Sequence, residues 1–234
     1  MLEKQIKQNH EIDREQIGNF VFEFRYIYDG NGDCNSDGIL KKEMGNCWQL
    51  PNDIQIVIDI GAHLGGTSIL AASMGAKVYA YEPEKELFGF LKTNIELNNF
   101  VDKIHPFKLA VGDIKLGKQR KLYVSNLNSV YNAIFNKGRG ARTFSENNTE
   151  IVDVISLGDI FKNNSIDYCD VLKVDCEYSE YEILTSCSPE LFKKIGIIAI
   201  EIHDRGDERK ALKEYLEKFY SNVGQNKDEF FFSN

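Results

Sequence analysis

The sequence predicts an α/β protein whose core is a mostly parallel, seven-stranded sheet with helices on both faces. Two observations carry this prediction. From residue 53 onward, short apolar runs alternate with longer segments in which apolar residues recur at helical spacing. The apolar runs, such as Ile54–Ile60, are almost unbroken, which is typical of parallel strands buried on both faces. Strands that alternate with helices form parallel sheets through right-handed crossovers.

The order of the elements follows from the same patterns. We expect strands at Ile54–Ile60, Lys77–Tyr81, Ile104–Val111, Ile151–Ile155, Val171–Val174 and Ile195–Ile202, and helices at Thr67–Met74, Glu84–Asn98, Glu180–Ser186 and Glu208–Phe219. The alternation breaks between Lys115 and Asn148, where we expect a short strand at Lys121–Val124 and loops at Gly138–Gly140 and Glu146–Thr149. A last hairpin, Tyr220–Val223 with Glu229–Phe232 and a turn at Gly224–Lys227, would form an antiparallel C-terminal edge.

The first 52 residues differ in character from the rest of the chain. Aromatic residues alternate with others over Phe20–Tyr28, which predicts a strand, and a Gly/Asn/Asp-rich loop follows at Asp29–Gly38. We therefore interpret residues 1–52 as an N-terminal extension packed on a main domain of residues 53–234. Asp33–Gly38 matches the first half of a calcium-binding EF-hand loop, but Met44 stands where a bidentate Glu is required. An Asx-rich surface loop is the simpler interpretation.

Charge and composition exclude several classes of partner. The chain has 28 basic and 36 acidic residues and a net charge of −8, and an acidic surface repels phosphate backbones, so no nucleic acid is expected.

No apolar run approaches the length of a membrane span, and the charged N-terminus lacks a signal-peptide core. The five cysteines form no Cys-x-x-Cys pair, which indicates free thiols in a reducing compartment. We expect a cytoplasmic protein, and nothing in the sequence indicates an oligomeric state.

A glycine-rich loop is the strongest local signal. Asp59-Ile60-Gly61-Ala62-His63-Leu64-Gly65-Gly66-Thr67 follows a buried strand and precedes a helix, where ligands bind beyond the carboxyl ends of parallel strands. His63 stands where a dinucleotide-binding loop needs its second glycine for close approach to a pyrophosphate. A ligand without phosphates fits better, which favours S-adenosylmethionine (SAM) over NAD. Glycines here permit a sharp turn and the close approach of a ligand.

An acidic residue at the end of the next strand supports the same ligand. Glu82 lies 21 residues beyond Gly61, and a carboxylate there can accept hydrogen bonds from both ribose hydroxyls of an adenosine. The alternative is that Glu82 is a helix N-terminal acid before Pro83.

Three ionisable residues are the candidates for catalysis. Asp175 and Glu177 follow the strand Val171–Val174 and alternate with apolar neighbours, so both are expected on one side of the chain. They could deprotonate or orient an acceptor hydroxyl, bind the SAM ammonium, or merely cap the next helix. His203 follows the strand Ile195–Ile202 and could be a general base or a hydrogen-bonded structural residue. A divalent metal site formed with Glu201 and Asp204 is a less favoured alternative.

The order of these motifs resembles the FkbM family of SAM-dependent methyltransferases. The resemblance rests on VIDIGAHLGGTS, YAYEPEKELFGFLKTNIELNN, VDVISLGDIF, LKVDCEYSEYEIL and IIAIEIH, which span Ile54 to His203. Tyr178 stands where the family usually has Gly, and Gly158 replaces an Asp. The resemblance implies a Rossmann-like SAM-binding domain at residues 53–234. It implies that Asp59, Gly61 and Gly65 line the methionine end of the cofactor, Glu82 binds the ribose, Val111 and Asp113 face the adenine, and Asp175 and Glu177 face the methyl group and the acceptor.

The resulting functional hypothesis is a methyltransferase that acts on a hydroxyl oxygen of a small molecule or carbohydrate. The residues expected to bind SAM are Asp59, Gly61, Ala62, His63, Gly65, Thr67, Glu82, Pro83, Val111 and Asp113. His63 is expected to pack behind the others. The alternative is a non-catalytic module that binds SAM or another adenosine ligand, with Tyr178 filling the acceptor pocket. That pocket is expected in Phe20–Trp48 and Ser125–Asn148, where Arg139 and Arg142 could suit a sugar or an anion, or simply lie in a solvated loop.

Overall fold

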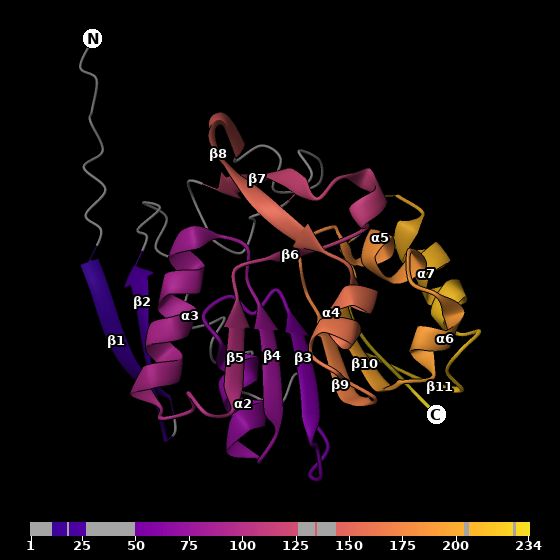
Figure 1. The fold of residues 1–234 in the computed structure, drawn as a ribbon, viewed down its shortest axis with the longest axis horizontal. Coiled ribbons are helices and arrows are strands. Elements are labelled where there is room, and N and C mark those ends of the chain that lie inside the picture. The colour runs from indigo at the N-terminus through magenta and orange to yellow at the C-terminus, as the bar shows by residue number, and fades with distance from the viewer. Residues whose placement is uncertain are drawn as a thin grey trace.

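The central sheet has the predicted architecture. A computed structural model describes residues 11–17, 19–26, 50–125, 134, 144–203, 206–226 and 228–234. Its seven-stranded sheet has the order β11-β12-β10-β9-β3-β4-β5. The five strands from β10 to β5 are parallel, and β12 pairs antiparallel with both β10 and β11 (Figure 1). The strands are β3 (Ile56–Ile60), β4 (Lys77–Tyr81), β5 (Ile104–Phe107), β9 (Cys169–Val174), β10 (Ile195–Glu201), β11 (Asn222–Asn226) and β12 (Glu229–Ser233).

Helices cover both faces of the sheet, as the unbroken apolar strands predict. One face packs on α2 (Gly66–Ser73) and α3 (Lys85–Leu97), and the other packs on α4 (Leu157–Asn163), α5 (Glu180–Thr185), α6 (Pro189–Phe192) and α7 (Glu208–Leu216). Adjacent residues of β3 contribute to the two cores: Val57 belongs to the core that contains Leu91 of α3, whereas Ile58 belongs to the core that contains Leu184 of α5. Val57 and Ile58 are both fully buried, because helices cover the strand on both sides. Such a strand needs apolar residues at successive positions.

An N-terminal hairpin packs on α3. It consists of β1 (Glu11–Ile17), which the charged sequence did not suggest, and β2 (Phe20–Tyr26), where a strand was expected; the last two residues of the expected strand lie outside the described residues. Phe22 is fully buried, and the Asn94 side chain of α3 bonds both the N–H and the C=O of Glu23. The contact supports an extension packed on the main domain, and the division at residue 52 stays a prediction.

A second, three-stranded sheet was not predicted. The expected strand Ile104–Val111 is wrong as one element, because it divides into β5 and β6 (Ala110–Val111). After β5, which contains Pro106 and lies at the edge of the large sheet, the chain crosses over and pairs β6 with β8 (Phe144–Ile155). β8 also pairs with β7 (Gln119–Ser125), and its backbone includes Glu146–Thr149, so the loop expected there is wrong. Polar residues suit such a strand because one face of an antiparallel sheet can meet solvent.

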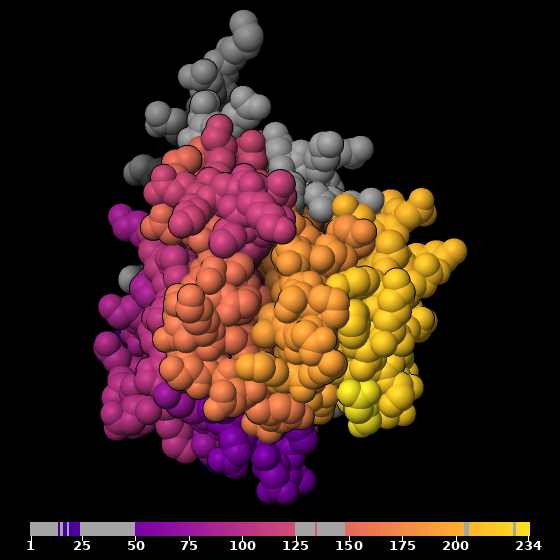
Figure 2. Space-filling model, turned by 45° about the vertical axis from the view of Figure 1, so that its right-hand side comes forward, coloured from indigo at the N-terminus to yellow at the C-terminus, as the bar shows by residue number. Residues whose placement is uncertain are grey.

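Two short helical elements were not predicted from the sequence, and one expected turn is wrong. The segment after Ile155 forms helix α4, whose N-terminus is capped by Ser156. A 3-10 turn, η1 (Ile114–Leu116), precedes β7; both are drawn in rose and form the upper part of the face seen in Figure 2. The expected turn at Gly224–Lys227 is wrong, since Gly224 lies within β11 and pairs with Phe231. Every residue of β11 is exposed, so its polar sequence has no buried face to mark it as a strand.

Several sequence interpretations fall outside the described residues. They concern the possible calcium loop Asp33–Gly38, the pair Arg139 and Arg142, the loop at Gly138–Gly140, and Asp204 as a metal ligand. Within the part of the chain that the structure describes, no helix is long and apolar enough to cross a membrane.

Candidate functional site

A cavity lies at the carboxyl ends of the central strands and brings most of the predicted residues together. It is open to solvent, and its empty space, including the part at the mouth, is about 730 Å³. Seven predicted residues line it: Gly61, His63, Glu82, Pro83, Val111, Asp175 and Glu177. The loops after β3, β4 and β9 supply most of these, because parallel strands all end at one edge of the sheet. The other predicted residues are not among the lining residues: Asp59, Ala62, Gly65, Thr67, Asp113 and His203.

Gly61 allows two strand ends to meet. Its φ is +75°, and a Cβ atom there would collide with the carbonyl oxygen of Asp175. Its N–H and that of Ala62 both donate to the carbonyl of Tyr81 at 3.0 Å. The glycine is therefore required by the backbone of the loop after β9, and not only by an incoming ligand. Gly65, with φ +92°, faces the Leu91 side chain and forms the N-cap of α2.

Glu82 is held with its carboxylate in the cavity. It is 5% exposed and accepts the N–H of His63 at 2.9 Å on one oxygen and the N–H of Glu84 at 3.0 Å on the other. Burial raises the pKa of Glu82 to about 7, despite these two bonds. Each oxygen keeps a further lone pair for a ligand. The helix N-terminal role belongs to Glu84, which caps α3 by accepting from the N–H groups of Glu86 and Leu87.

His63 contributes a neutral ring to the cavity wall. Its backbone is left-handed, with φ +52°. Burial and the charge of Lys173 together lower the pKa of His63 to about 4, and the charge of Asp175 opposes them. The side chain is therefore uncharged at neutral pH.

One wall of the cavity is apolar, and half of its residues belong to the second sheet. It consists of Leu87, Leu109, Ala110, Val111, Leu122 and Ile134. A buried ion pair fastens this sheet to α5: Arg120 of β7 lies 2.7 Å from Glu182. Glu182 also accepts the N–H of Asp113 at 2.7 Å, while Arg120 donates to the carbonyl of Asp113. Asp113 thus shapes the loop after β6 through its backbone, and its carboxylate caps η1.

A buried lysine links the glycine loop to the acidic end of the cavity. Lys173 of β9 is 1% exposed, and its Nζ atom donates to the carbonyl of Gly61 at 2.6 Å. The same nitrogen lies 3.3 Å from the carboxylate of Asp59 and 3.7 Å from that of Asp175. Asp59 also accepts from the Ser68 hydroxyl at 2.6 Å and is fully buried. Asp59 therefore supports the loop from behind, and Asp175 reaches the cavity.

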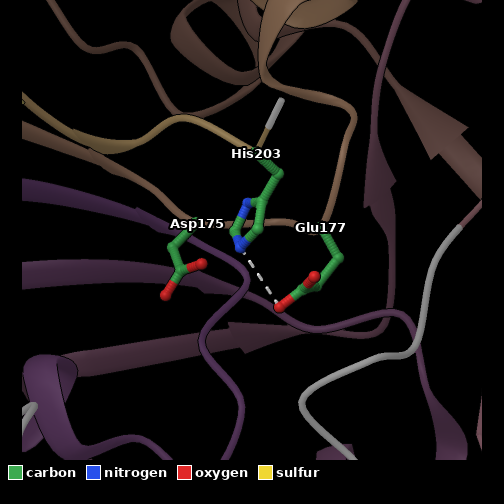
Figure 3. A group of neighbouring side chains, drawn as sticks. All are labelled: Asp175, Glu177 and His203. Carbon is green, nitrogen blue, oxygen red and sulfur yellow. Dashed lines mark ion pairs between the residues drawn. The ribbon is translucent and has the colours of Figure 1, made fainter. Parts of the chain in front are cut away.

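Asp175, Glu177 and His203 converge at the acidic end (Figure 3). One donor atom from each lies within 4.8 Å of the others, and His203 Nε2 is 3.4 Å from Glu177. Burial raises the pKa of Glu177 to about 8, with His203 opposing this and the surrounding carboxylates adding to it. Burial alone would lower the pKa of His203, but its hydrogen bond to Glu180 and the charges of Glu180, Glu177 and Asp175 raise it to about 10.

These three groups could hold a cation only if His203 gave up its Nε2 proton. An imidazolium carries a proton on both ring nitrogens, whereas a metal ligand must be neutral. With a pKa of about 10, the His203 ring carries both protons at neutral pH.

Two residues of the site were not identified from the sequence. Ser179 lines the cavity, and its buried hydroxyl has no hydrogen-bond partner among the described residues. Glu180 is fully buried and bonds the His203 ring at 2.9 Å. Its signal was present as the third acid of the segment LKVDCEYSEYEIL, but a glutamate at the start of a helix is usually exposed. Tyr178 is not among the cavity-lining residues; its ring packs on that of His203 with centroids 5.3 Å apart.

Comparison with known proteins identifies the family. The model of the methyltransferase FkbM domain matches residues 59–227. No curated protein matches the chain. Among solved structures, the METTL16 MTase domain aligns with 16% identity and a TM-score of 0.45, covering 85% of this chain and 66% of that one. The N-terminal domain of human METTL16 in complex with SAH gives 17% identity, a TM-score of 0.46 and coverages of 85% and 68%.

A third solved structure is similar over a larger share of its own length. The precorrin-6y C5,15-methyltransferase from Geobacter metallireducens GS-15 aligns with 12% identity and a TM-score of 0.44, covering 83% of each chain. The present chain spans about two thirds of the METTL16 domains. The family model covers most of the chain, from the glycine-rich loop to the C-terminal hairpin. The chain therefore belongs to the FkbM methyltransferase family.

Proposed function

We propose that this protein transfers a methyl group from SAM to a hydroxyl oxygen of a small-molecule or carbohydrate acceptor. One observation carries the proposal. A single cavity joins the glycine loop, the Glu82 carboxylate and an apolar wall at one end to Asp175 and Glu177 at the other. This arrangement offers one place for an adenosine and a second for a nucleophile that needs its proton removed.

The residues at the first end fit SAM. Glu82 would accept hydrogen bonds from the ribose hydroxyls through its remaining lone pairs. Val111 and Leu122 offer apolar surface to the adenine, next to the loop that Glu182 and Arg120 hold in place. The backbone around Gly61 and the Ser179 hydroxyl would contact the methionine part. When bound, SAM supplies a methyl group on a positively charged sulfur and leaves as S-adenosylhomocysteine.

The residues at the second end suit the activation of a hydroxyl. Glu177, with its raised pKa, is a stronger base than an ordinary carboxylate and would take the proton of the acceptor hydroxyl as its oxygen forms the new bond to carbon. Asp175 would orient that hydroxyl in line with the methyl group. His203 would supply positive charge beside Glu177 without exchanging a proton.

The charge of the cavity favours a neutral acceptor. Among the described residues that line it, the acidic side chains are Glu82, Asp175 and Glu177, of which Glu177 is mostly protonated at neutral pH, and none is a lysine or an arginine. Carboxylates repel phosphate groups, so nucleic acid is a poor fit. The non-catalytic alternative loses its motivation, because Tyr178 packs against His203 and is not among the residues that line the cavity.

A transfer assay tests the proposal. The protein is incubated with methyl-labelled SAM and a panel of neutral glycosides, amino sugars, uronic acids and short RNA, and label transfer and S-adenosylhomocysteine release are measured. We expect transfer to a neutral hydroxyl compound and its loss in Glu177→Gln. Transfer to RNA alone, or equal transfer by Glu177→Gln, would contradict the proposal.

A further inference from the structure

A single carboxylate oxygen joins the ends of the two strands that carry the acidic cluster. Glu180 is 1% exposed and is the first residue of α5. Its Oε1 atom accepts the N–H of Cys176 at 3.3 Å and that of Tyr178 at 3.2 Å. The same oxygen lies 2.9 Å from Nδ1 of His203. Glu180 therefore contacts the loop after β9 on one side and the segment after β10 on the other.

The bonds to the loop fix an unusual backbone. Glu177 and Tyr178 both have left-handed conformations, with φ of +51° and +75°. Side chains other than glycine rarely adopt such values unless their surroundings hold them. The two N–H groups that Glu180 accepts lie on either side of Glu177. This turn directs the Glu177 carboxylate to the cavity and toward His203.

The bond to the ring fixes the orientation of His203. With Nδ1 on Glu180, the Nε2 atom faces Glu177 at 3.4 Å and Glu201 of β10 at 3.9 Å. Asp175 contributes further negative charge, and the Tyr178 ring packs on the imidazole. Among the described groups facing the imidazole, the titratable ones are thus four carboxylates and one phenol, and Glu180 makes the shortest contact. Without Glu180, a ring buried in this way would lose the partner that most strongly favours its charged form.

We propose that Glu180 is a positioning residue that holds the Glu177 carboxylate at the cavity by fixing both the turn at Tyr178 and the ring of His203. Glu180 is not among the residues that line the cavity, so it acts through these neighbours. The inference rests on the proposed function only where methyl transfer is its readout. It also accounts for Tyr178 at a left-handed position, because a bonded N–H and a packed ring stabilise the backbone there.

The first test is the titration of His203, which needs no acceptor. The chain has four histidines, so the His203 signal in ¹³C–¹H spectra is assigned from its loss in His203→Asn. In the wild type we expect His203 to stay protonated up to about pH 9. In Glu180→Gln, which keeps an acceptor oxygen but loses the charge, the midpoint should fall by about one pH unit or more. A wild-type ring that loses its proton below pH 7, or an unchanged midpoint in the variant, would overturn the inference.

The second test separates positioning from a general structural role. For Glu180→Gln we expect kcat to fall about tenfold or more, with SAM affinity within about twofold of the wild type, since a hydrogen bond to a charged group is lost away from the cofactor. Glu190→Gln, at an exposed ion pair on α6, is the matched control and should change neither value. An equal loss of SAM affinity, or an unchanged kcat, would contradict a positioning role.

The two failures can be told apart. If no acceptor is methylated but His203 titrates as expected in both proteins, the proposed function fails and the inference stands. If methylation is found and the His203 midpoint does not respond to Glu180→Gln, the inference fails and the function stands. Should the variant not fold, the wild-type titration alone still decides whether His203 is held as a cation.

Discussion

The Nζ atom of Lys173 lies 2.6 Å from the carbonyl oxygen of Gly61, so a lysine in the middle of the sheet supports the glycine loop from beneath. The same nitrogen balances the buried carboxylate of Asp59 and approaches Asp175 in the cavity. The Lys173 ammonium group thus contacts the end of β3 at Asp59, the glycine loop at Gly61 and the loop after β9 at Asp175. The relationship explains how the buried carboxylate of Asp59 and the buried lysine coexist in an otherwise apolar sheet, because their charges are paired with one another.

Replacing this lysine should destabilise the fold. Lys173→Met leaves Asp59 buried without its cation, and breaking a buried pair in this way costs about 3–5 kcal/mol of the free energy of unfolding. Urea denaturation followed by circular dichroism measures the change. Lys193→Met, which removes a lysine from an exposed ion pair, is the control and should alter stability by about 0.5 kcal/mol or less. Equal effects of the two substitutions would show that Lys173 is not structurally important.

The ion pair between the second sheet and α5 should affect ligand binding. Arg120→Ala removes the partner of Glu182, which holds the N–H of Asp113 beside the adenine wall. We expect SAM affinity to fall about tenfold, because a charge-assisted hydrogen bond is worth about 1.5–3 kcal/mol and part of it positions this loop. Calorimetry compares the variant with Lys121→Ala at the neighbouring exposed position, which should bind SAM normally. An unchanged affinity in Arg120→Ala would mean that the loop needs no such support.

The rate of methyl transfer should depend on the ionisation of Glu177. Its pKa of about 8 lies above the ordinary value, so the carboxylate form that accepts a proton increases as the pH rises through 8. At saturating SAM and acceptor, kcat should therefore increase from pH 6 to 9. Glu177→Gln should lose this dependence and lower kcat by about 100-fold. A profile that is flat over this range, or one that Glu177→Gln retains, would argue for another base.

Tyr178 should be replaceable by the residue that is usual in the family. Tyr178→Gly keeps the N–H that Glu180 accepts and relieves the left-handed backbone, but it removes the ring that packs on His203. We expect folding and SAM affinity to be retained, with kcat changed by no more than about fivefold, since the ring is not among the cavity-lining groups. A gain of transfer activity from none would instead favour the view that Tyr178 blocks the acceptor.

The sequence predicted the large sheet well because its strands are buried on both faces. Runs such as Ile54–Ile60 need successive apolar residues, and that demand leaves a clear pattern. Strands were expected at Lys121–Val124 and Ile151–Ile155, which lie within β7 and β8, but the small sheet itself was not predicted, because β8 is polar over Glu146–Glu150 and β6 has only two residues. Every residue of β11 is exposed, so the strand has no alternation of apolar and polar residues that would mark its end. The hairpin turn was therefore placed too early.

The sequence predicted the site residues that directly follow a strand. It did not predict those whose role depends on contacts with distant parts of the chain. Glu82 and Asp175 reach the cavity because of their place at strand ends. The sequence pattern could not distinguish Asp59 and Glu180 from acids that line the cavity, since all of them lie near strand ends. Only the folded chain shows that Asp59 faces Lys173 and that Glu180 faces His203. Their charge states depend on distances across the sheet, which no local sequence signal contains.

The most direct test of the central claim is isothermal titration of the protein with SAM and S-adenosylhomocysteine, with NADH as the control ligand. We predict that both sulfur compounds bind and NADH does not. In Glu82→Ala their affinity should fall about tenfold or more while the folded state remains, because the ribose loses a charged acceptor. Binding of NADH, no binding of either sulfur compound, or full affinity in Glu82→Ala would contradict the assignment of this cavity to SAM.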